Sequence, residues 1–357
     1  MILREGKRWD VYSMGICVKN GENKMIIPTE AGFPPLAKIF HLRPARLSDA
    51  EAIAALTLAV CSADGEPSLA LSEDDLRQYW QEPGFYLDTD TWVAETADGR
   101  IIGYEELYNR HGFAALEGDG YIHPDFVGKG IGTALLKMLD ARARQVMLQA
   151  APDLRVFIRN SMHISDMRAR ELHEHEGYVP IRFTWRMEIR LEKPHADPKW
   201  PEGVELRPFL AEEHARPLFE ALDEAFRDHW GHVPMRYENW HSLTVEREDF
   251  DPSLWFVAWD GDQIAGMSLC RYRAGMGWVN MLGVRRPWRK HGLGLALLVH
   301  SFGEFFRRGE KTIGLTVDAH SPTGATRLYK RAGMHVTSEF VSYLKELRPG
   351  REITEEE

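Results

Sequence analysis

Cysteine is scarce in this sequence: its three residues, Cys17, Cys61 and Cys270, lie far apart in a chain of 357 residues. An odd number of cysteines at these spacings cannot form a disulfide framework, and no C-x-x-C pair points to zinc or redox chemistry. The scarcity therefore favours a reducing, cytoplasmic setting. We expect no metal to take part in the function.

Long hydrophobic runs are missing as well, since no uninterrupted apolar stretch approaches the ~20 residues that cross a bilayer. Positive charge is in the minority, because 44 Lys and Arg stand against 54 Asp and Glu, a formal charge of −10. Such a chain has no general attraction for nucleic acids or anionic membranes, so neither is an expected partner. A local basic patch can still bind one anionic small molecule. The oligomeric state stays open.

What the sequence does contain is a repeat at domain scale. Two domains fit the length, because one hydrophobic core rarely grows past about 250–300 residues. Four landmarks recur in the same order: Leu42-Arg43-Pro44 with Leu206-Arg207-Pro208, Val93-Ala94 with Val257-Ala258, Gly130-Ile131-Gly132 with Gly292-Leu293-Gly294, and Gly177 with Gly333. The predicted organisation is an extension at 1–38, a first domain at 39–192, a Pro-rich linker at 193–202, a second domain at 203–350 and an acidic tail at 351–357.

Both copies show the same order of strand and helix patterns. An early strand is followed by helical periodicity, with capping boxes at Ser48-x-x-Glu51 and Ser72-x-x-Asp75 in the first copy. Hairpin turns follow at residues 98–99 and 260–262. Next come a strand, a glycine loop, an amphipathic helix, another strand, a short helix that ends at a glycine, and a last strand that closes each copy. The pattern predicts an α/β fold, in which each copy is a mostly antiparallel mixed sheet flanked by helices.

The most informative stretch runs from residue 284 to 296, where a strand turns through small residues into a helix. The first N–H groups of a helix lack internal partners and lie at the positive end of its dipole, so the loop favours an anion. Gly292 and Gly294 leave room for a pyrophosphate near the backbone. Three basic residues precede these glycines and add local positive charge: Arg289, Lys290 and His291. The first copy has the same loop, with fewer cations, at residues 127–133.

A single glycine loop is as often a tight turn with packing glycines, but two loops in the same context favour a shared ligand site. With these motifs the sequence resembles the GNAT superfamily of N-acetyltransferases. The acetyl-CoA signature of that family, R/Q-x-x-G-x-G/A, is matched by residues 289–294. A second family pattern is matched by Val317-Asp318, Leu328-Tyr329 and Gly333-Met334. The tandem layout is similar to that of mycothiol synthases.

The resemblance implies an acyltransferase that moves an acetyl group from acetyl-CoA to the amine of a small molecule, by direct transfer in a ternary complex. It implies that Tyr329 protonates the departing thiolate, and it makes Asp318 a candidate general base, with His320 as a second candidate. The alternatives are a packed helix tyrosine and a turn aspartate. The residues expected to bind acetyl-CoA are Leu282, Val284, Arg289, Lys290, His291, Gly292, Leu293, Gly294, Leu295 and Ala296 in the second copy, and Gly128, Lys129, Gly130, Gly132 and Thr133 in the first.

The first copy departs from the family pattern. Val127 takes the position of Arg289, and His173 takes that of Tyr329, so we expect this copy to bind acetyl-CoA weakly or only to shape the other one. His173 and His175 lie two apart on a helix and point to different faces, which argues against shared metal ligation. The alternative function is an acyl-CoA-binding regulatory or scaffolding module without turnover.

Overall fold

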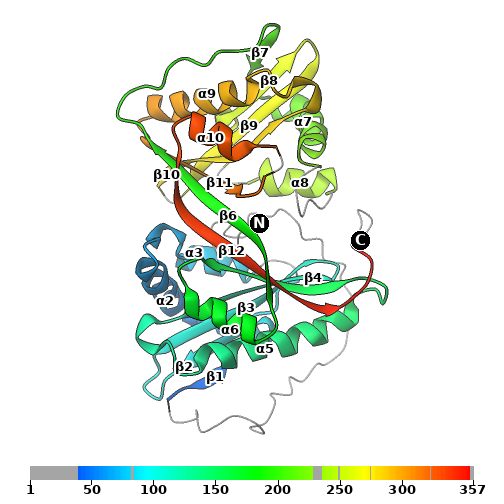
Figure 1. Cartoon of the computed structure of the whole chain (residues 1–357). Coiled ribbons are helices and arrows are strands. Elements are labelled where there is room, and N and C mark those ends of the chain that lie inside the picture. Colours follow the sequence, from blue (N-terminus) through cyan, green and yellow to red (C-terminus); the bar gives the residue numbers. More distant parts are fainter. Residues whose placement is uncertain are drawn as a thin grey trace. The chain divides into compact units, whose positions relative to one another are not determined.

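The computed structural model describes residues 39–81, 84–227, 235–247, 250–273, 275–321 and 323–353. The extension predicted at residues 1–38, and Cys17 with it, lies outside this part of the chain. The chain divides into two compact units (Figure 1). The C-terminal unit is Arg182–Phe340, and the N-terminal unit joins the chain before Arg182 to Val341–Glu357.

The N-terminal unit is built on a sheet of strand order β1-β2-β3-β4-β5-β12. Its strands are β1 (His41–Arg43), β2 (Thr91–Glu95), β3 (Ile101–His111), β4 (Ala115–Ile122), β5 (Val156–His163) and the second part of β12 (His335–Arg348). Its helices are α2 (Ala50–Ala63), α3 (Glu73–Tyr79), α4 (Leu87–Asp90), α5 (Ile131–Val146) and α6 (Met167–His175). β4 and β5 are parallel, and the pairs among β1 to β4 are antiparallel.

The C-terminal unit repeats this plan, with the strand order β12-β6-β11-β10-β9-β8-β7. Its strands are β6 (Val179–Arg190), β7 (Val204–Arg207), β8 (Trp255–Asp260), β9 (Gln263–Arg273), β10 (Met276–Val284) and β11 (Thr312–Asp318). The first part of β12, up to Phe340, also belongs to this unit. Its helices are α7 (Ala211–Phe226), α8 (Tyr237–Thr244), α9 (Leu293–Arg307) and α10 (Ala325–Arg331). The α/β class and the mixed, mostly antiparallel sheets are as predicted.

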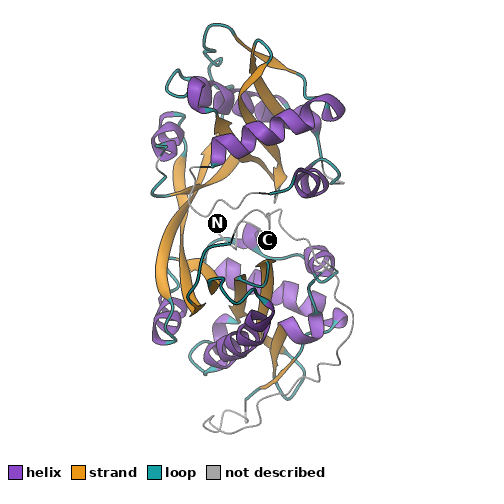
Figure 2. Cartoon of the chain, turned by 90° about the vertical axis from the view of Figure 1, so that its right-hand side faces the viewer, coloured by secondary structure: helices purple, strands orange, loops and turns teal. Residues whose placement is uncertain are grey.

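Helices cover both faces of the C-terminal sheet, as Figure 2 also shows. A Cβ atom added at Gly283 of β10 would lie 3.3 Å from Ala225 of α7, whereas one added at Gly266 of β9 would lie 3.2 Å from Leu297 of α9. α9 packs on the sheet because its apolar residues recur at helical spacing and are buried: Leu293, Ala296, Leu297, Leu298, Phe302 and Phe305. The position of α9 brings the glycine loop to the carboxyl end of β10.

The prediction that a last strand closes each copy is wrong. β6, the last strand of the first repeat, pairs with β11 in the C-terminal unit, in antiparallel register from Arg190↔Thr312 to Thr184↔Asp318. The second part of β12 belongs to the N-terminal unit, where Ser342 Oγ lies 2.7 Å from Ser161 Oγ of β5. The repeats carry the same strand patterns, so the sequence offers each last strand two equivalent partners. Continuity along the chain does not decide between them.

Most predictions about short stretches of the chain are confirmed. The hairpins β2–β3 and β8–β9 form at the expected turns, and Ser72 forms its capping box with Asp75. The capping box predicted at Ser48 does not form, because the Asp49 side chain accepts the Arg46 N–H at 2.7 Å and begins a 3₁₀ turn there. The linker has neither helix nor strand, yet its Trp200 packs against His300 of α9. Among the described helices, none is long and apolar enough to cross a membrane.

A chain that stops after Phe340 should lose the folded N-terminal unit. The deletion removes Val341, Tyr343 and Leu344, which are buried, and burial of each is worth about 1.5–3 kcal/mol. That sum approaches the whole stability of a typical domain, about 5–15 kcal/mol. Hydrogen exchange should therefore show lost protection across residues 39–181. A chain that stops after residue 353 is the control, and native protection in the shorter chain would contradict the exchange of last strands.

Candidate functional site

The strands β10 and β11 part in the middle of the C-terminal sheet. Their parallel register joins Gly277 to Ile313 and Trp278 to Gly314 and ends there, although both strands continue. An irregularity between Val279 and Met281 accompanies the separation. Leu282 and Val284 follow on the separated part of β10, where backbone groups that face the gap can pair with an extended ligand, as in strand addition.

The glycine loop ends the gap with a concave backbone. Lys290 and Gly292 have φ angles of 68° and 88°, in the left-handed region, and α9 begins at Leu293. Left-handed residues in such a turn can direct successive N–H groups toward one point, the geometry of an anion-binding nest. The first-turn amides of α9, which include those of Leu295 and Ala296, add the positive end of a helix dipole.

The second glycine of the motif has a packing role. A Cβ atom at Gly294 would lie 3.1 Å from Cδ1 of Leu328, so the absence of a side chain lets α10 approach the first turn of α9. The next residue of α10 is Tyr329. Tyr329 itself belongs to the same buried apolar cluster as Leu293, the residue with which α9 begins.

Arg289 donates hydrogen bonds to two backbone carbonyl groups. Its Nε donates to Val284 O at 3.0 Å, and its guanidinium also donates to Ala225 O at 3.1 Å. The side chain thus ties the end of α7 to the end of β10. Lys290 and His291 are exposed beside the nest, and Lys290 supplies positive charge there.

Tyr329 is buried among the apolar residues that join α9, α10 and β11, including Leu293 and Val317. Its side chain is 8% exposed, and burial raises the pKa of the phenol to about 12. Burial favours the neutral form, because a phenolate would lose its hydration. At neutral pH Tyr329 therefore keeps its phenolic proton.

Asp318 ends β11 and is already hydrogen-bonded. Arg182 Nε donates to its carboxylate at 2.9 Å, and the backbone N–H of His320 donates at 2.8 Å. Arg182 belongs to β6, in the other sequence repeat, so no local pattern could associate it with this site. The exposed His320 ring lies 6.2 Å from the ring of Phe183, also on β6.

The N-terminal unit reproduces the same backbone. Gly128 and Gly130 have φ angles of 82° and 79°, α5 begins at Ile131, and β4 and β5 part after Glu117↔Arg159. A Cβ atom at Gly132 would lie 3.1 Å from Cδ2 of Leu172 on α6, which repeats the contact of Gly294 with Leu328. Thr133 lies in the first turn of α5. The two loops are therefore equivalent in three dimensions.

A cation from another element lies near the loop of the first copy. Arg168 of α6 is exposed, and its guanidinium lies 3.6 Å from the position of a Cβ atom at Gly128. This cation was missed because it follows the loop by a whole helix and strand. The Lys129 amino group, in contrast, lies over the Phe126 ring at 4.3 Å.

The interior next to α5 contains polar groups. Glu105 Oε1, Asn160 Oδ1 and His173 Nε2 are buried and have no hydrogen-bond partner among the described residues. Burial, with Asp119 and Asp140 nearby, raises the pKa of Glu105 well above its ordinary value. Burial thus favours the neutral form of Glu105.

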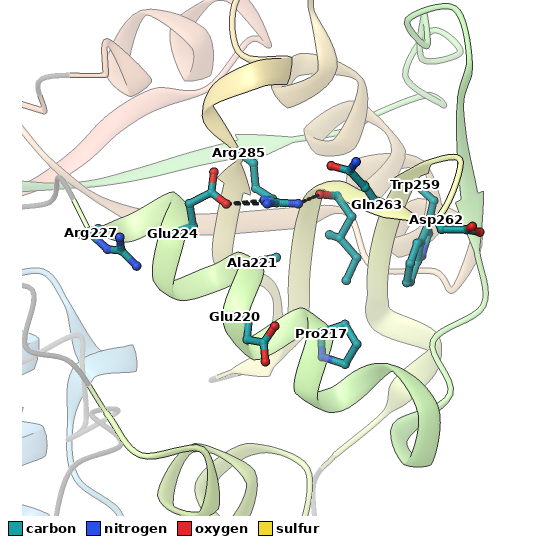
Figure 3. A pocket seen from close by; sticks show the side chains of 10 residues that line it. Pro217, Glu220, Ala221, Glu224, Arg227, Trp259, Asp262, Gln263 and Arg285 are labelled. Atoms are coloured by element: carbon teal, nitrogen blue, oxygen red, sulfur yellow. Dashed lines mark hydrogen bonds and ion pairs between the residues drawn. The ribbon is translucent and has the colours of Figure 1, made fainter.

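A cavity of about 610 Å³ opens elsewhere in the C-terminal unit, between α7 and the β8–β9 hairpin (Figure 3). Arg285 lines the cavity, and its Nε donates to the Glu224 carboxylate at 2.7 Å. Trp259 and Asp262 line the cavity from the hairpin. None of the site residues expected from the sequence lines this cavity, so the cavity is distinct from the glycine-loop site.

These features agree with what the comparisons show. The Acetyltransferase (GNAT) family model matches residues 215–334, and an Acetyltransferase (GNAT) domain model matches residues 88–180. The chain belongs to the GNAT family of acetyltransferases, with two such domains in tandem, and is an acyltransferase.

Among its relatives is the mycothiol acetyltransferase of Thermobispora bispora, 30% identical over 62% of this chain and 75% of the relative. That of Geodermatophilus obscurus is 27% identical over 84% and 94%. The crystal structure of a GCN5-related N-acetyltransferase from Sphaerobacter thermophilus is 38% identical, covers 88% of this chain and 98% of its own, and has a TM-score of 0.79. A tandem GNAT protein from the clavulanic acid biosynthesis pathway (17%, TM-score 0.66) shares the fold.

Gly292→Asp should weaken acetyl-CoA binding to the C-terminal unit. Like charges about 4 Å apart repel by about 4 kcal/mol at an effective dielectric constant of about 20, so we expect a loss of roughly 100-fold or more by calorimetry. Gly292→Asn is the matched control, because Asn has the same size and tolerates φ near 88° equally well. Equal losses of acetyl-CoA affinity in the two variants would contradict the binding of an anion at this loop.

Glu105→Gln should stabilise the N-terminal unit at pH 8. The folded pKa of Glu105 is raised above the ordinary value of 4.5, so its contribution to stability is fully present below about pH 4.5 and is lost as pH rises toward the folded pKa. The loss amounts to about 1.4 kcal/mol per pH unit in that window. Thermal unfolding should show a gain in Tm at pH 8 that shrinks at pH 5. A gain independent of pH would contradict the raised pKa.

Proposed function

We propose that the C-terminal unit transfers an acetyl group from acetyl-CoA directly to the amine of a small molecule. The observation that supports the proposal is a buried, neutral Tyr329 in the same apolar cluster as Leu293, the residue with which α9 begins after the glycine loop. The N-terminal unit has the nest but lacks the tyrosine.

Acetyl-CoA fits the gap in the C-terminal sheet. The pyrophosphate would accept hydrogen bonds from loop amides between Lys290 and Ala296, and the pantetheine arm would pair with β10 near Leu282 and Val284. Backbone N–H groups at this point can polarise the thioester carbonyl, an oxyanion-hole effect. Arg289 supports this arrangement indirectly, since it anchors the end of β10.

The chemistry requires one bond to form and one to break. The neutral amine nitrogen attacks the thioester carbon, the C–S bond breaks, and Tyr329 gives its proton to the thiolate. The proton that the nitrogen loses as the amide forms returns to the Tyr329 phenolate through water, so the step balances. Asp318 is our candidate to accept the ammonium proton through water, and its hydrogen bond with Arg182 fixes its orientation. His320 is the second candidate for this role.

A small-molecule acceptor is supported by the relatives, which are named mycothiol acetyltransferases. A panel of small-molecule amines, assayed for thiol release from acetyl-CoA, tests the proposal directly. Release that depends on an amine supports transfer. Lack of amine-dependent release by folded protein, across thiol-bearing, amino-sugar and amino-acid amines, would favour a binding module for the whole chain.

Tyr329→Phe should lower kcat by roughly 10²–10⁴-fold, the usual contribution of general acid catalysis, with little change in acetyl-CoA affinity. The ring stays in its apolar site and the proton is lost. Tyr272→Phe is the matched control, because Tyr272 is exposed on β9 and loses the same hydroxyl. Steady-state thiol release and calorimetry separate the two effects. Wild-type turnover in Tyr329→Phe would exclude this tyrosine as the proton donor.

A further inference from the structure

The N-terminal unit has a buried imidazole in the place of the catalytic phenol. Gly132 contacts Leu172 as Gly294 contacts Leu328, so His173 and Tyr329 occupy equivalent positions on α6 and α10. His173 is 8% exposed. Its ring packs edge-on against Tyr178, with a centroid distance of 5.0 Å, and lies 5.9 Å from the ring of Tyr343. These contacts hold the ring in one orientation.

Hydrogen bonding determines which nitrogen of His173 carries the proton. Nδ1 lies 2.7 Å from the carbonyl oxygen of Ala169, which accepts only, so Nδ1 must be the N–H. Burial lowers the pKa of the imidazole below its ordinary value, so the ring is neutral at physiological pH. Nε2 is therefore a lone-pair acceptor, buried and without a partner among the described residues.

The neighbouring hydroxyls do not donate to this acceptor. Tyr178 OH donates to Asp140 at 2.8 Å, and Tyr343 OH donates to Glu174 at 2.6 Å. A buried acceptor without a donor costs about 1–3 kcal/mol, so a ligand that supplies an N–H, O–H or S–H here gains affinity. The glycine loop and the nearby Arg168 lie at the start of α5, and Leu172, the residue before His173, lies against Gly132 in the first turn of that helix.

We propose that the N-terminal unit is a binding site for coenzyme A in its free-thiol form, with His173 as the residue that selects the thiol over the thioester. The S–H donates to Nε2, whereas a thioester sulfur presents only lone pairs to it. The proposal rests on the nucleotide-binding role proposed above for the glycine loops. No bond changes in this site, since its only imidazole N–H is held by Ala169.

The two copies then respond to opposite states of one molecule. The C-terminal unit consumes the thioester, and the N-terminal unit retains the thiol that the reaction releases. Tyr329 presents a proton to sulfur, and His173 presents a lone pair. The difference of one side chain at equivalent positions gives the duplicated fold one site for the substrate and one for the product.

The test uses the full chain with Gly292→Asp, which silences the C-terminal nest, and compares CoA with acetyl-CoA by calorimetry. We expect CoA to bind about three- to tenfold more tightly, the value of one neutral hydrogen bond. His173→Phe should erase this preference, and His173→Tyr should move it toward acetyl-CoA. Arg168→Gln should weaken both ligands equally, because it acts on the phosphates that they share.

Equal or tighter binding of acetyl-CoA by the Gly292→Asp chain overturns the proposal, and so does the absence of binding by both ligands. The comparison of CoA with acetyl-CoA in the Gly292→Asp chain, which keeps His173, tests the proposal even if the His173 variants fail to fold. Thiol release by the wild-type chain is measured separately. Transfer activity without a thiol preference refutes this inference alone, whereas loss of both refutes the proposed function as well.

Discussion

The antiparallel pairing of β6 with β11 is the contact on which the C-terminal site depends. β11 must be held firmly on one side if β10 is to leave it on the other, and the register from Thr312 to Asp318 provides that support. The same pairing brings Arg182 to the carboxylate of Asp318. The edges of β10 and β11 that face the gap lack sheet partners beyond Trp278↔Gly314, so the β6 pairing is what keeps β11 in the sheet there.

The two units show how far one backbone can serve different chemistry. Both loops use a left-handed residue two positions before a left-handed glycine, and both place a second glycine against a leucine of the next helix. The backbone of the loop supplies the anion site in each unit and needs no particular side chain. The residue after that leucine is free to differ, and it is a tyrosine in one unit and a histidine in the other.

Features that depend on a short stretch of chain were predictable from sequence. The hairpins, the amphipathic helices and the glycine loops follow from spacing within about fifteen residues, and the structure contains them. Features that depend on residues remote in sequence were not. Arg182 and Arg168 reach their sites from other elements, and Arg289 binds carbonyl groups of β10 and α7 that no motif connects with it. The exchange of last strands was hidden by the repeat itself, since equivalent partners look alike.

The exchange also sets the order in which the protein can be completed on the ribosome. Residues 39–181 are synthesised first, but their sheet waits for Val341–Arg348, which emerge only after the whole C-terminal unit. At ~5–20 residues per second the delay is roughly ten to thirty seconds. During that time the edge of β5 is without its final neighbour, so the nascent N-terminal unit is exposed to chaperones and proteases. The unit translated first is the last to be finished.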